Sequence, residues 1–346
     1  MGWRESTVIE QPETKTRVAG FTLPGVEKSA GDGRFVAPHE IALPYPAIEE
    51  LPQFVCRISS GDLAHGVRHY NGSVALHDGR IFMAYRFESF RAVSSVGFAE
   101  LDPATFEVMK NTVLEPALDN PETHIEDPHL ASVGGRLFVV VSNVVRGFPP
   151  VCRQRMLEVD PFSMTVVGEI PMTYGNIRGI EKNWTPFELP DGSLGIVYKQ
   201  KPRTVISVES GEGWTAENLA VGPKDSSLSG RTGPLDVGEF YLEFVGGHVV
   251  MPHRGTRYWF GAILFEKVAP FKVVHTTGEQ PLVWASEASP TIFNPVPRGG
   301  HPVCILPAGA FVRGGSVWVS CGVNDSYNVI LRFSLDQLMK RLQKNG

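Results

Sequence analysis

Two acidic residues stand side by side near the start of a long apolar stretch, THIEDPHLASVGGRLFVVVSN, at residues 123–143. They are Glu126 and Asp127, and the histidines His124 and His129 lie on either side of them. Carboxylates beside imidazoles can transfer protons or hold a metal ion. The rest of the stretch, with a Gly-Gly pair between apolar runs, is typical of a β-hairpin. The acidic pair is therefore expected where a buried strand begins.

A metal ion is not the preferred interpretation of this cluster. The sequence has no H-E-x-x-H pattern or other recognised ligand spacing, and alternate residues of a strand point to opposite faces. A Ser-His-Asp hydrolase is also disfavoured, because no G-x-S-x-G turn is present. We therefore expect no metal and no other cofactor, and the acidic pair is interpreted as a proton-handling group.

Five segments of the chain share one pattern, in which an apolar strand is followed by a tight glycine turn and a second strand rich in β-branched residues. The turn glycines are separated by 56, 57, 55 and 68 residues. Repeated units of this size predict an all-β, five-bladed β-propeller. The alternative is an irregular β-sandwich, which the regular spacing disfavours. The turn glycines are Gly79, Gly135, Gly192, Gly247 and Gly315.

Two parts of the chain lie outside the repeat. Residues 1–60 are expected to form an N-terminal extension that packs on the propeller or precedes it. The C-terminal sequence SLDQLMKRLQK predicts a short helix with Ser334 as its N-cap. Residues 61–346 are therefore predicted to form the propeller catalytic domain, including this helix.

Polar residues recur at one end of the predicted blades. The first strand of a blade starts at the same mouth of the propeller where the second strand ends, so these positions converge on the axis. The starts of the first strands supply Asn71, Glu126, Asp127, Lys182, Asn183, Trp184 and His301. The ends of the second strands supply Arg86, Asn143, Lys199, His253, Arg254 and Asp325. We expect these side chains to line a polar funnel.

The mixture of charges in this funnel suits an anionic ligand with many hydroxyl groups. Carboxylates can hydrogen-bond sugar hydroxyls, and one of them can protonate a departing oxygen. Arginine and lysine can hold phosphate or a nucleotide diphosphate. A bound anion next to a carboxylic acid also raises the pKa of that acid and helps it to keep its proton.

Composition narrows the remaining classes of function. The chain has 346 residues, of which 42% are hydrophobic and 20% are charged, and its formal net charge of −5 does not favour nucleic acid as a partner. No apolar run approaches the roughly 18 residues of a membrane-spanning helix. The four cysteines show no CxxC spacing and are interpreted as reduced thiols, which predicts a cytoplasmic protein.

The motifs EDPHL, IEKNWTPFE, MPHRGTRYWFGAILFE and VSCGVND, in this order, resemble glycoside hydrolase family 130, which contains β-mannoside phosphorylases and β-1,2-mannosidases. They are also similar to the related glycosyltransferase family 108. The resemblance covers about residues 65–335 and implies a five-bladed propeller and an inverting mechanism. In the family an aspartate donates the proton, in phosphorylases through a hydroxyl of the bound sugar.

The resemblance also implies roles for individual residues. The E-D-P motif assigns the proton donor to Asp127, with Glu126 beside it as a sugar-binding neighbour. His129 departs from the arginine that usually follows this motif. The implied phosphate ligands are Arg86, Asn143, Lys199, His253 and Tyr258. Independently of the resemblance, their place in the funnel makes six residues candidate sugar ligands: Asn71, Lys182, Asn183, Trp184, His301 and Asp325. Trp184 fits packing in the core equally well.

We therefore predict an enzyme that transfers a mannosyl-like residue between a β-mannoside and phosphate or a nucleotide diphosphate. Because the residues implied to bind phosphate are retained, a phosphorylase or glycosyltransferase is favoured over a hydrolase. A β-mannoside hydrolase and a non-catalytic glycan-binding propeller are the alternatives. The expected partners are a glycoside or oligosaccharide and phosphate or a nucleotide sugar. A homo-oligomeric assembly is left open, as are the sugar and its linkage.

Overall fold

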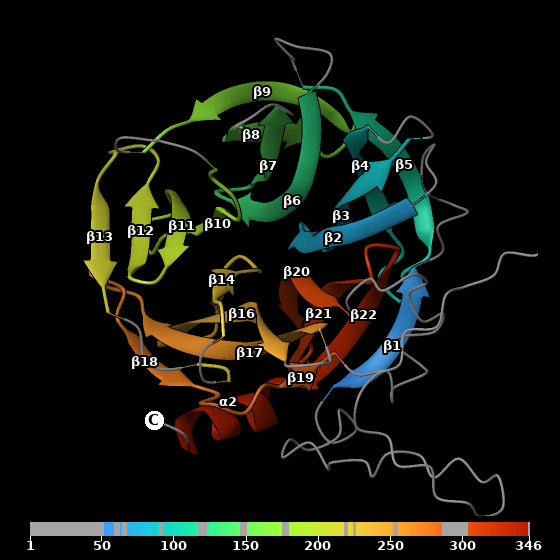
Figure 1. The fold of residues 1–346 in the computed structure, drawn as a ribbon. Helices are drawn as coiled ribbons and strands as arrows, with labels where there is room; N and C mark the ends of the chain where they lie inside the picture. Colours follow the sequence, from blue (N-terminus) through green and yellow to red (C-terminus); the bar gives the residue numbers. More distant parts are fainter. Residues whose placement is uncertain are drawn as a thin grey trace, which may run out of the picture. The chain divides into compact units, whose positions relative to one another are not determined.

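Strands gather into sheets that surround a common axis (Figure 1). The computed structural model describes residues 52–58, 63, 68–89, 93–116, 123–145, 151–174, 180–217, 221–223, 226–251, 255–285 and 304–344. These residues form five antiparallel sheets in a ring, so the predicted five-bladed propeller is confirmed.

The first three blades are four-stranded sheets in which chain order equals spatial order. Blade 1 contains β2 (Arg68–His77), β3 (Arg80–Glu88), β4 (Ser94–Leu101) and β5 (Val108–Leu114). Blade 2 contains β6 (Thr123–Val133), β7 (Arg136–Val145), β8 (Val151–Asp160) and β9 (Thr165–Met172). Blade 3 contains β10 (Thr185–Glu188), β11 (Leu194–Gln200), β12 (Arg203–Ser207) and β13 (Gly213–Ala216).

The last two blades depart from this plan. In blade 4 two short inner strands, β14 (Ser229–Gly230) and β15 (Leu235–Asp236), both pair with β16 (Phe240–Met251). The blade continues with β17 (Gly255–Glu266), which pairs with β18 (Val273–Thr276) and β19 (Val283–Trp284). Blade 5 contains β20 (Ile305–Arg313), β21 (Ser316–Val323) and β22 (Tyr327–Ser334), and β1 (Gln53–Ile58) forms its outer strand. β1 comes from the stretch 1–60 that the sequence set apart as an extension.

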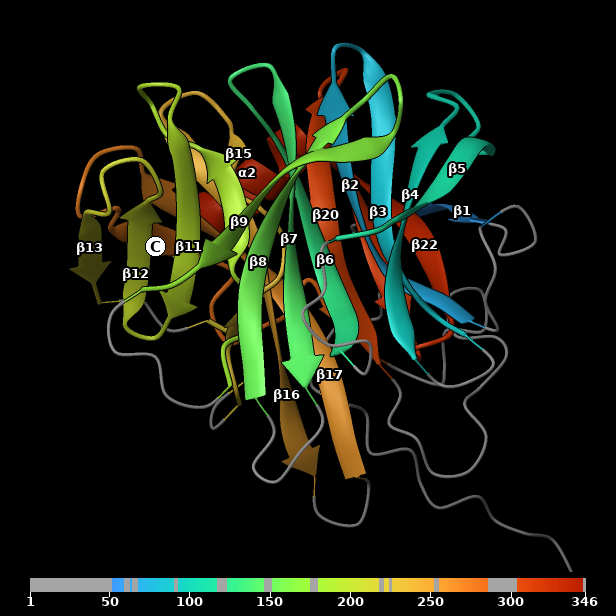
Figure 2. The ribbon, with the colours of Figure 1, turned by 90° about the horizontal axis from the view of Figure 1, so that it is seen from above.

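Four of the five predicted hairpin turns are correct. Gly79, Gly135, Gly192 and Gly315 all have positive φ in the turn between the first and second strands of their blades. Such conformations are nearly free of strain for glycine. In Figure 2 the turns between first and second strands lie toward the upper edge, opposite the mouth where the second strands end.

The prediction of a turn at Gly247 is wrong. Gly247 and its neighbour Gly246 lie inside β16 and pair with Trp259 and Phe260 of β17. A Cβ atom on Gly247 would lie 1.8 Å from the carbonyl oxygen of Ser227. Glycine is therefore needed there for close backbone contact with the inner segment of the blade. The turn is at Gly238 instead, with φ of 93°.

The hydrophobic core lies between the blades, because each sheet buries both of its faces against its neighbours. Five clusters of buried side chains each join adjacent blades. The helix α2 (Leu335–Lys344) packs Leu338 and Leu342 into the cluster between blades 4 and 5. Gln337 N donates a hydrogen bond to Ser334 Oγ at 3.4 Å, which is consistent with the predicted cap. In the described part of the chain no helix is long and apolar enough to cross a membrane.

The centre of the ring is closed by polar contacts between inner strands. Leu130 N donates to Ser73 Oγ at 2.9 Å, and Val74 N donates to Ser320 Oγ at 3.2 Å. A Cβ atom on Gly309 would lie 2.2 Å from Val74 N, so the backbones of β2 and β20 touch here. These contacts tie the inner strands of blades 1, 2 and 5 tightly to one another near the axis.

One ion pair links blades 3 and 4 without access to solvent. Arg203 Nη1 lies 2.8 Å from Glu243 Oε2, and both side chains are 0% exposed. The Gln200 amide donates to Glu243, and its oxygen accepts from Arg203 Nη1 at 2.8 Å. The guanidinium also lies 3.9 Å from the ring centroid of Phe265. Removing one charge would leave the other buried and uncompensated.

We predict that Glu243→Gln lowers the free energy of unfolding by about 3 kcal/mol, because the variant keeps the shape of the side chain but leaves the Arg203 charge unpaired. Urea denaturation monitored by circular dichroism measures the change. The matched control is Glu158→Gln, whose partner Arg136 is 54% exposed and 3.7 Å away. That variant should lose less than about 1 kcal/mol. Equal losses in the two variants would contradict the assigned role of the buried pair.

Candidate functional site

Three inner segments carry a residue in the left-handed backbone conformation at the same place in their blades. Asn71, Asp127 and Asn183 have φ of 50°, 48° and 62° and are separated by 56 residues each. In β2 and β6 the strand register shifts at this point, which marks a β-bulge. Asn and Asp tolerate the left-handed region better than most residues. These three residues line one small cavity on the axis.

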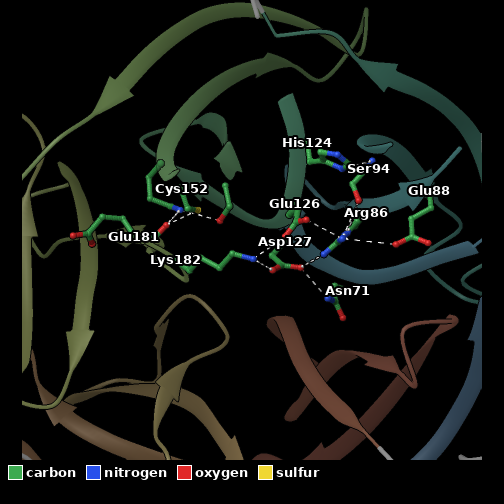
Figure 3. Close-up of polar contacts among 12 residues, drawn as sticks. Asn71, Arg86, Glu88, Ser94, His124, Glu126, Asp127, Cys152, Glu181 and Lys182 are labelled. Atoms are coloured by element: carbon green, nitrogen blue, oxygen red, sulfur yellow. Dashed lines mark hydrogen bonds and ion pairs between the residues drawn. The ribbon is translucent and has the colours of Figure 1, made fainter. Parts of the chain in front are cut away.

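Asp127 is the centre of a cluster of charges from three blades (Figure 3). Its Oδ1 accepts a hydrogen bond from Asn71 Nδ2 at 3.0 Å and lies 3.4 Å from Arg86 Nη1. Its Oδ2 lies 3.5 Å from Lys182 Nζ. Blade 1 supplies Asn71 and Arg86, and Lys182 precedes the first strand of blade 3.

Glu126 contacts the same two cations as Asp127. Its Oε1 accepts from Arg86 Nη2 at 3.0 Å, and its Oε2 accepts from Lys182 Nζ at 2.7 Å. Two carboxylates and two cations therefore form a closed quartet in which every carboxylate meets both cations. We call these four residues, Arg86, Glu126, Asp127 and Lys182, the charge quartet. Its formal charge is balanced, so an incoming anion must compete with the carboxylates for the cations.

A chain of hydrogen bonds holds Arg86 in the quartet. Ser94 Oγ accepts from Arg86 Nε at 3.1 Å and from Nη2 at 2.9 Å. The Nδ1 atom of His124 in turn accepts the backbone N–H of Ser94 at 3.2 Å. His124 is buried, and its Nδ1 must be unprotonated to accept this bond. One of the two histidines beside the acidic pair thus supports the arginine.

Neighbouring backbone contacts hold Lys182 in place. The carbonyl oxygen of Glu181 accepts from Cys152 Sγ at 2.9 Å and from Gln154 Nε2 at 2.8 Å. Glu181 N donates to the carbonyl oxygen of Cys152 at 3.2 Å. Both partners lie on β8 of blade 2, so the segment that carries Lys182 is fixed against the blade that carries the acidic pair (Figure 3).

The quartet sets the protonation state of Asp127. Burial alone would raise the pKa of its carboxyl, but Arg86 and Lys182, with the hydrogen bond from Asn71, outweigh burial and hold the pKa at about 2. Burial would lower the pKa of the Lys182 ammonium group, and Asp127 and Glu126 raise it above its usual range. In the absence of a ligand, Asp127 is therefore an ionised carboxylate at neutral pH.

Arg231 is a functional candidate that the sequence analysis missed. It lies between β14 and β15, the two short inner strands of blade 4, and in sequence it belongs to the stretch GPKDSSLSGRTGP. Burial lowers the pKa of its guanidinium, although Asp127 is near enough to oppose this. Because blade 4 breaks the repeat, the only sequence signal for Arg231 was that it is a basic residue among small polar residues. Its cavity of about 20 Å³ is lined by Asn71, Asp127, Pro128, His129, Asn183, Arg231, Leu306, Pro307 and Ala308.

His129 lines this cavity as a neutral ring. The side chain is buried, and burial lowers the pKa of the imidazole to about 4 in spite of the nearby Asp127 carboxylate. Hydrogen bonds to the backbone of Ala308 and of Arg231 favour the protonated ring, but burial outweighs them. The cavity is thus lined by the basic residue Arg231 of blade 4, while the position after E-D-P holds an uncharged residue.

Asn143 and Asp325 lie near the quartet, whereas Tyr258 lies near Arg231 and Asp325. Asn143 pairs with Ile125, next to Glu126 in β6, and its Oδ1 is buried without a partner in the described part of the chain. Asp325 has a left-handed φ of 45°, and burial together with the Asp127 charge raises the pKa of its carboxyl. Tyr258 lies on β17, where burial raises the pKa of its hydroxyl.

Lys199 is exposed and lines a separate pocket of about 240 Å³. Its ammonium group lies 4.9 Å from the ring centroid of Tyr198. Lys182, Asn183 and Lys201 line the same pocket, so Lys182 connects it to the quartet.

Of the two interpretations of Trp184, stacking on a sugar or packing in the core, the structure supports packing in the core. Its side chain is 1% exposed, and the ring packs edge-on against Tyr198 with centroids 5.0 Å apart. Its Nε1 donates to Glu181 Oε2 at 3.3 Å, which satisfies the one polar atom of the ring. Trp184 is a core residue of the interface between blades 2 and 3. The predicted ligands His253 and His301, with Arg254, lie outside the described residues.

Solved structures with this fold include enzymes that act on mannosides. The β-1,2-mannobiose phosphorylase of Listeria innocua is 15% identical, with a TM-score of 0.59 over 81% of this chain and 92% of that chain. A mannose phosphorylase of Leishmania mexicana in complex with phosphate is 14% identical, with a TM-score of 0.51 over 86% of this chain and 91% of that chain.

A third structure belongs to a study of glycoside hydrolase family 130, in which mannoside phosphorylases stand beside hydrolases that target β-1,2 linkages in Candida mannan. It is 14% identical, with a TM-score of 0.59 over 83% of this chain and 95% of that chain. Comparisons with family models and with curated protein sequences give no match. The predicted resemblance to family 130 is confirmed at the level of the fold.

We predict that Asp127 makes stability depend on acid pH. Its folded-state pKa of about 2 lies below the ordinary aspartate value of about 3.9, so ionisation favours the folded state. The contribution, about 2 kcal/mol, is fully present above about pH 4 and is lost as the pH falls through about 2. The difference in unfolding free energy between the wild type and Asp127→Asn should therefore shrink between pH 5 and pH 2.

Urea denaturation at stepped pH measures this difference. Asp336→Asn is the control, because its carboxylate is exposed and pairs with Lys340, also exposed and on the same helix. The control should change stability by less than about 0.5 kcal/mol at every pH. A difference for Asp127→Asn that does not vary with pH would contradict the low pKa.

Proposed function

We propose that the chain is a carbohydrate-active enzyme that transfers a mannosyl-like residue, with inversion, between a β-mannoside and inorganic phosphate. The observation that carries the proposal is the charge quartet, in which Arg86 and Lys182 both contact the carboxylate that the E-D-P motif assigns as proton donor. An anion held by these cations lies beside the proton-transfer group. The mannoside phosphorylases of the same fold support the choice of sugar and of phosphate.

The low pKa of Asp127 supports action first as a base, in the synthetic direction. The ionised carboxylate accepts the proton of an acceptor hydroxyl, directly or through a hydroxyl of the bound sugar. The acceptor oxygen then bonds to the anomeric carbon while the bond from that carbon to the phosphate oxygen breaks, and phosphate leaves with the electron pair. Asp127 ends this step protonated, and Arg86 and Lys182 balance the charge of the departing phosphate.

Phosphate also prepares the reverse reaction. When a phosphate dianion draws Arg86 and Lys182 away from the carboxylates, Asp127 loses its stabilising charges and gains a negative neighbour. Both changes raise the pKa of its carboxyl. The acid form needed to protonate the departing glycosidic oxygen is thereby favoured when the nucleophile is bound. A nucleotide diphosphate could use the same cations, but their convergence on one carboxylate pair favours a single phosphoryl group.

We predict that Asp127→Asn loses at least about a hundredfold in rate, because an amide cannot exchange the proton. The assay supplies α-mannose 1-phosphate and a mannoside acceptor and follows phosphate release; GDP-mannose replaces the donor in a parallel reaction. Full activity of the variant would remove Asp127 from the mechanism. Release of free mannose without dependence on phosphate would select a hydrolase, and glycan binding without turnover would select a binding protein.

We predict that Lys182→Gln raises the KM for phosphate by at least about tenfold, because one of the two cations that hold the anion is lost. The KM for the mannoside should change much less. Lys110→Gln is the matched control, since Lys110 is an exposed lysine on the outer strand of blade 1. Initial rates at varied phosphate and fixed mannoside give both constants. An unchanged phosphate KM in Lys182→Gln would contradict the anion role.

A further inference from the structure

A second pocket of about 370 Å³ lies at the end of the axis opposite the charge quartet. Each inner segment contributes residues to both cavities, and in each blade the residues nearer the hairpin turn line the opposite pocket. The cavity at the quartet is lined by Asn71, Asp127, Asn183, Arg231 and Pro307. The opposite pocket is lined by Leu76, Ser132, Glu188, Asp236 and Val312. We call the latter the far-axis pocket.

The two pockets are separate. No residue lines both cavities. Contacts between the inner strands lie close to both linings, with Leu130 N bonded to Ser73 Oγ and the backbones of Gly309 and Val74 touching. The far-axis pocket is therefore built from other residues than the quartet cavity, and its function is argued separately.

The charge of the far-axis pocket excludes a second phosphate. Among the described residues that line it there is no lysine, arginine or histidine, and two are carboxylates. Asp236 is neutralised by Lys267, whose Nζ lies 2.5 Å from Oδ2. Glu188 accepts the backbone N–H of Gly134 at 2.8 Å and has no cation partner among the described residues. One weakly compensated carboxylate repels anions but is too little charge to select a polyamine.

The remaining chemistry of the lining fits a neutral sugar. Glu188 and Ser132 offer hydrogen-bonding oxygens, and Leu76, Val312 and a group of prolines offer apolar surface. A pyranose ring has the same division, with hydroxyls around its edge and C–H groups on its faces. The volume lies within the range of small-molecule sites and can hold about two sugar units. The prolines are Pro186, Pro190 and Pro234.

We propose that the far-axis pocket is a second carbohydrate-binding site, which takes a short neutral oligosaccharide and performs no chemistry. The choice of a mannoside as the sugar rests on the proposed function, whereas the site itself rests on the cavity and its charge. Such a site would hold a long glycan substrate on the enzyme while the quartet acts on a chain end, and would raise the apparent affinity for polymers over that for disaccharides.

Filling the pocket tests the proposal. Calorimetric titration of Asp127→Asn with β-1,2-mannotriose should show two binding sites, and addition of Val312→Trp should abolish one of them. Val268→Trp, a change at a side chain that is 66% exposed and outside the pocket, should leave both. Alone, Val312→Trp should keep kcat on a disaccharide within about twofold of the wild type and raise the KM for a long mannan at least about fivefold.

Several results would overturn the proposal. Identical binding by Val312→Trp and Val268→Trp would do so, as would a pocket that binds inorganic phosphate or spermidine in place of the sugar. If Val312→Trp does not fold, Leu76→Trp and a crystal of Asp127→Asn soaked with mannotriose give the same decision. The two proposals can also fail separately. If Val312→Trp abolishes sugar binding at one site but the protein shows no turnover, the proposed function is contradicted and the second sugar-binding site is still supported.

Discussion

The pairing of Glu126 and Asp127 with Arg86 and Lys182 is the interaction on which the mouth of the propeller depends. Four charges that are costly to bury singly become tolerable as a closed set, because each carboxylate meets both cations. The set requires three blades to meet at one point, so it also fixes how these blades sit against one another. The charges that would bind a ligand are therefore also the charges that join the blades. A ligand that binds Arg86 and Lys182 must disturb the contact between the blades.

The same inner strands build two ends of opposite electrical character. At the mouth the left-handed residues Asn71, Asp127 and Asn183 line a cavity together with Arg231. Further along the same segments, the lining consists of apolar and small residues with two carboxylates. Because the two cavities share no lining residue, one end can suit an anion while the other disfavours it. The blades of a propeller repeat one backbone pattern, but its function depends on the side chains that differ from blade to blade.

Much of this arrangement could be predicted from the sequence, because hairpin turns and strand ends leave local signals. Gly79 and Gly135 mark turns through the backbone conformations that they permit, and the acidic pair stands where a first strand begins. Gly247 does not mark a turn, because glycine can also serve close backbone packing, and the residue that requires it, Ser227, is distant in sequence. Arg231 was missed for the related reason that its strand is short and broken. Trp184 could not be assigned, since stacking on a sugar and packing in a core leave the same residue in the sequence.

The pairing of β1 with β22 has a consequence for how the chain acquires its structure. Gln53 lies opposite Arg332, so the fifth blade joins residues about 280 positions apart. During synthesis β1 emerges early, and it stays unpaired until its partner β22, near the end of the chain, has been made. The ring then closes in a late step of high contact order, which slows folding and leaves an exposed strand edge in the interval. The closed ring gains cooperativity in return, because opening the fifth blade separates both ends of the propeller at once.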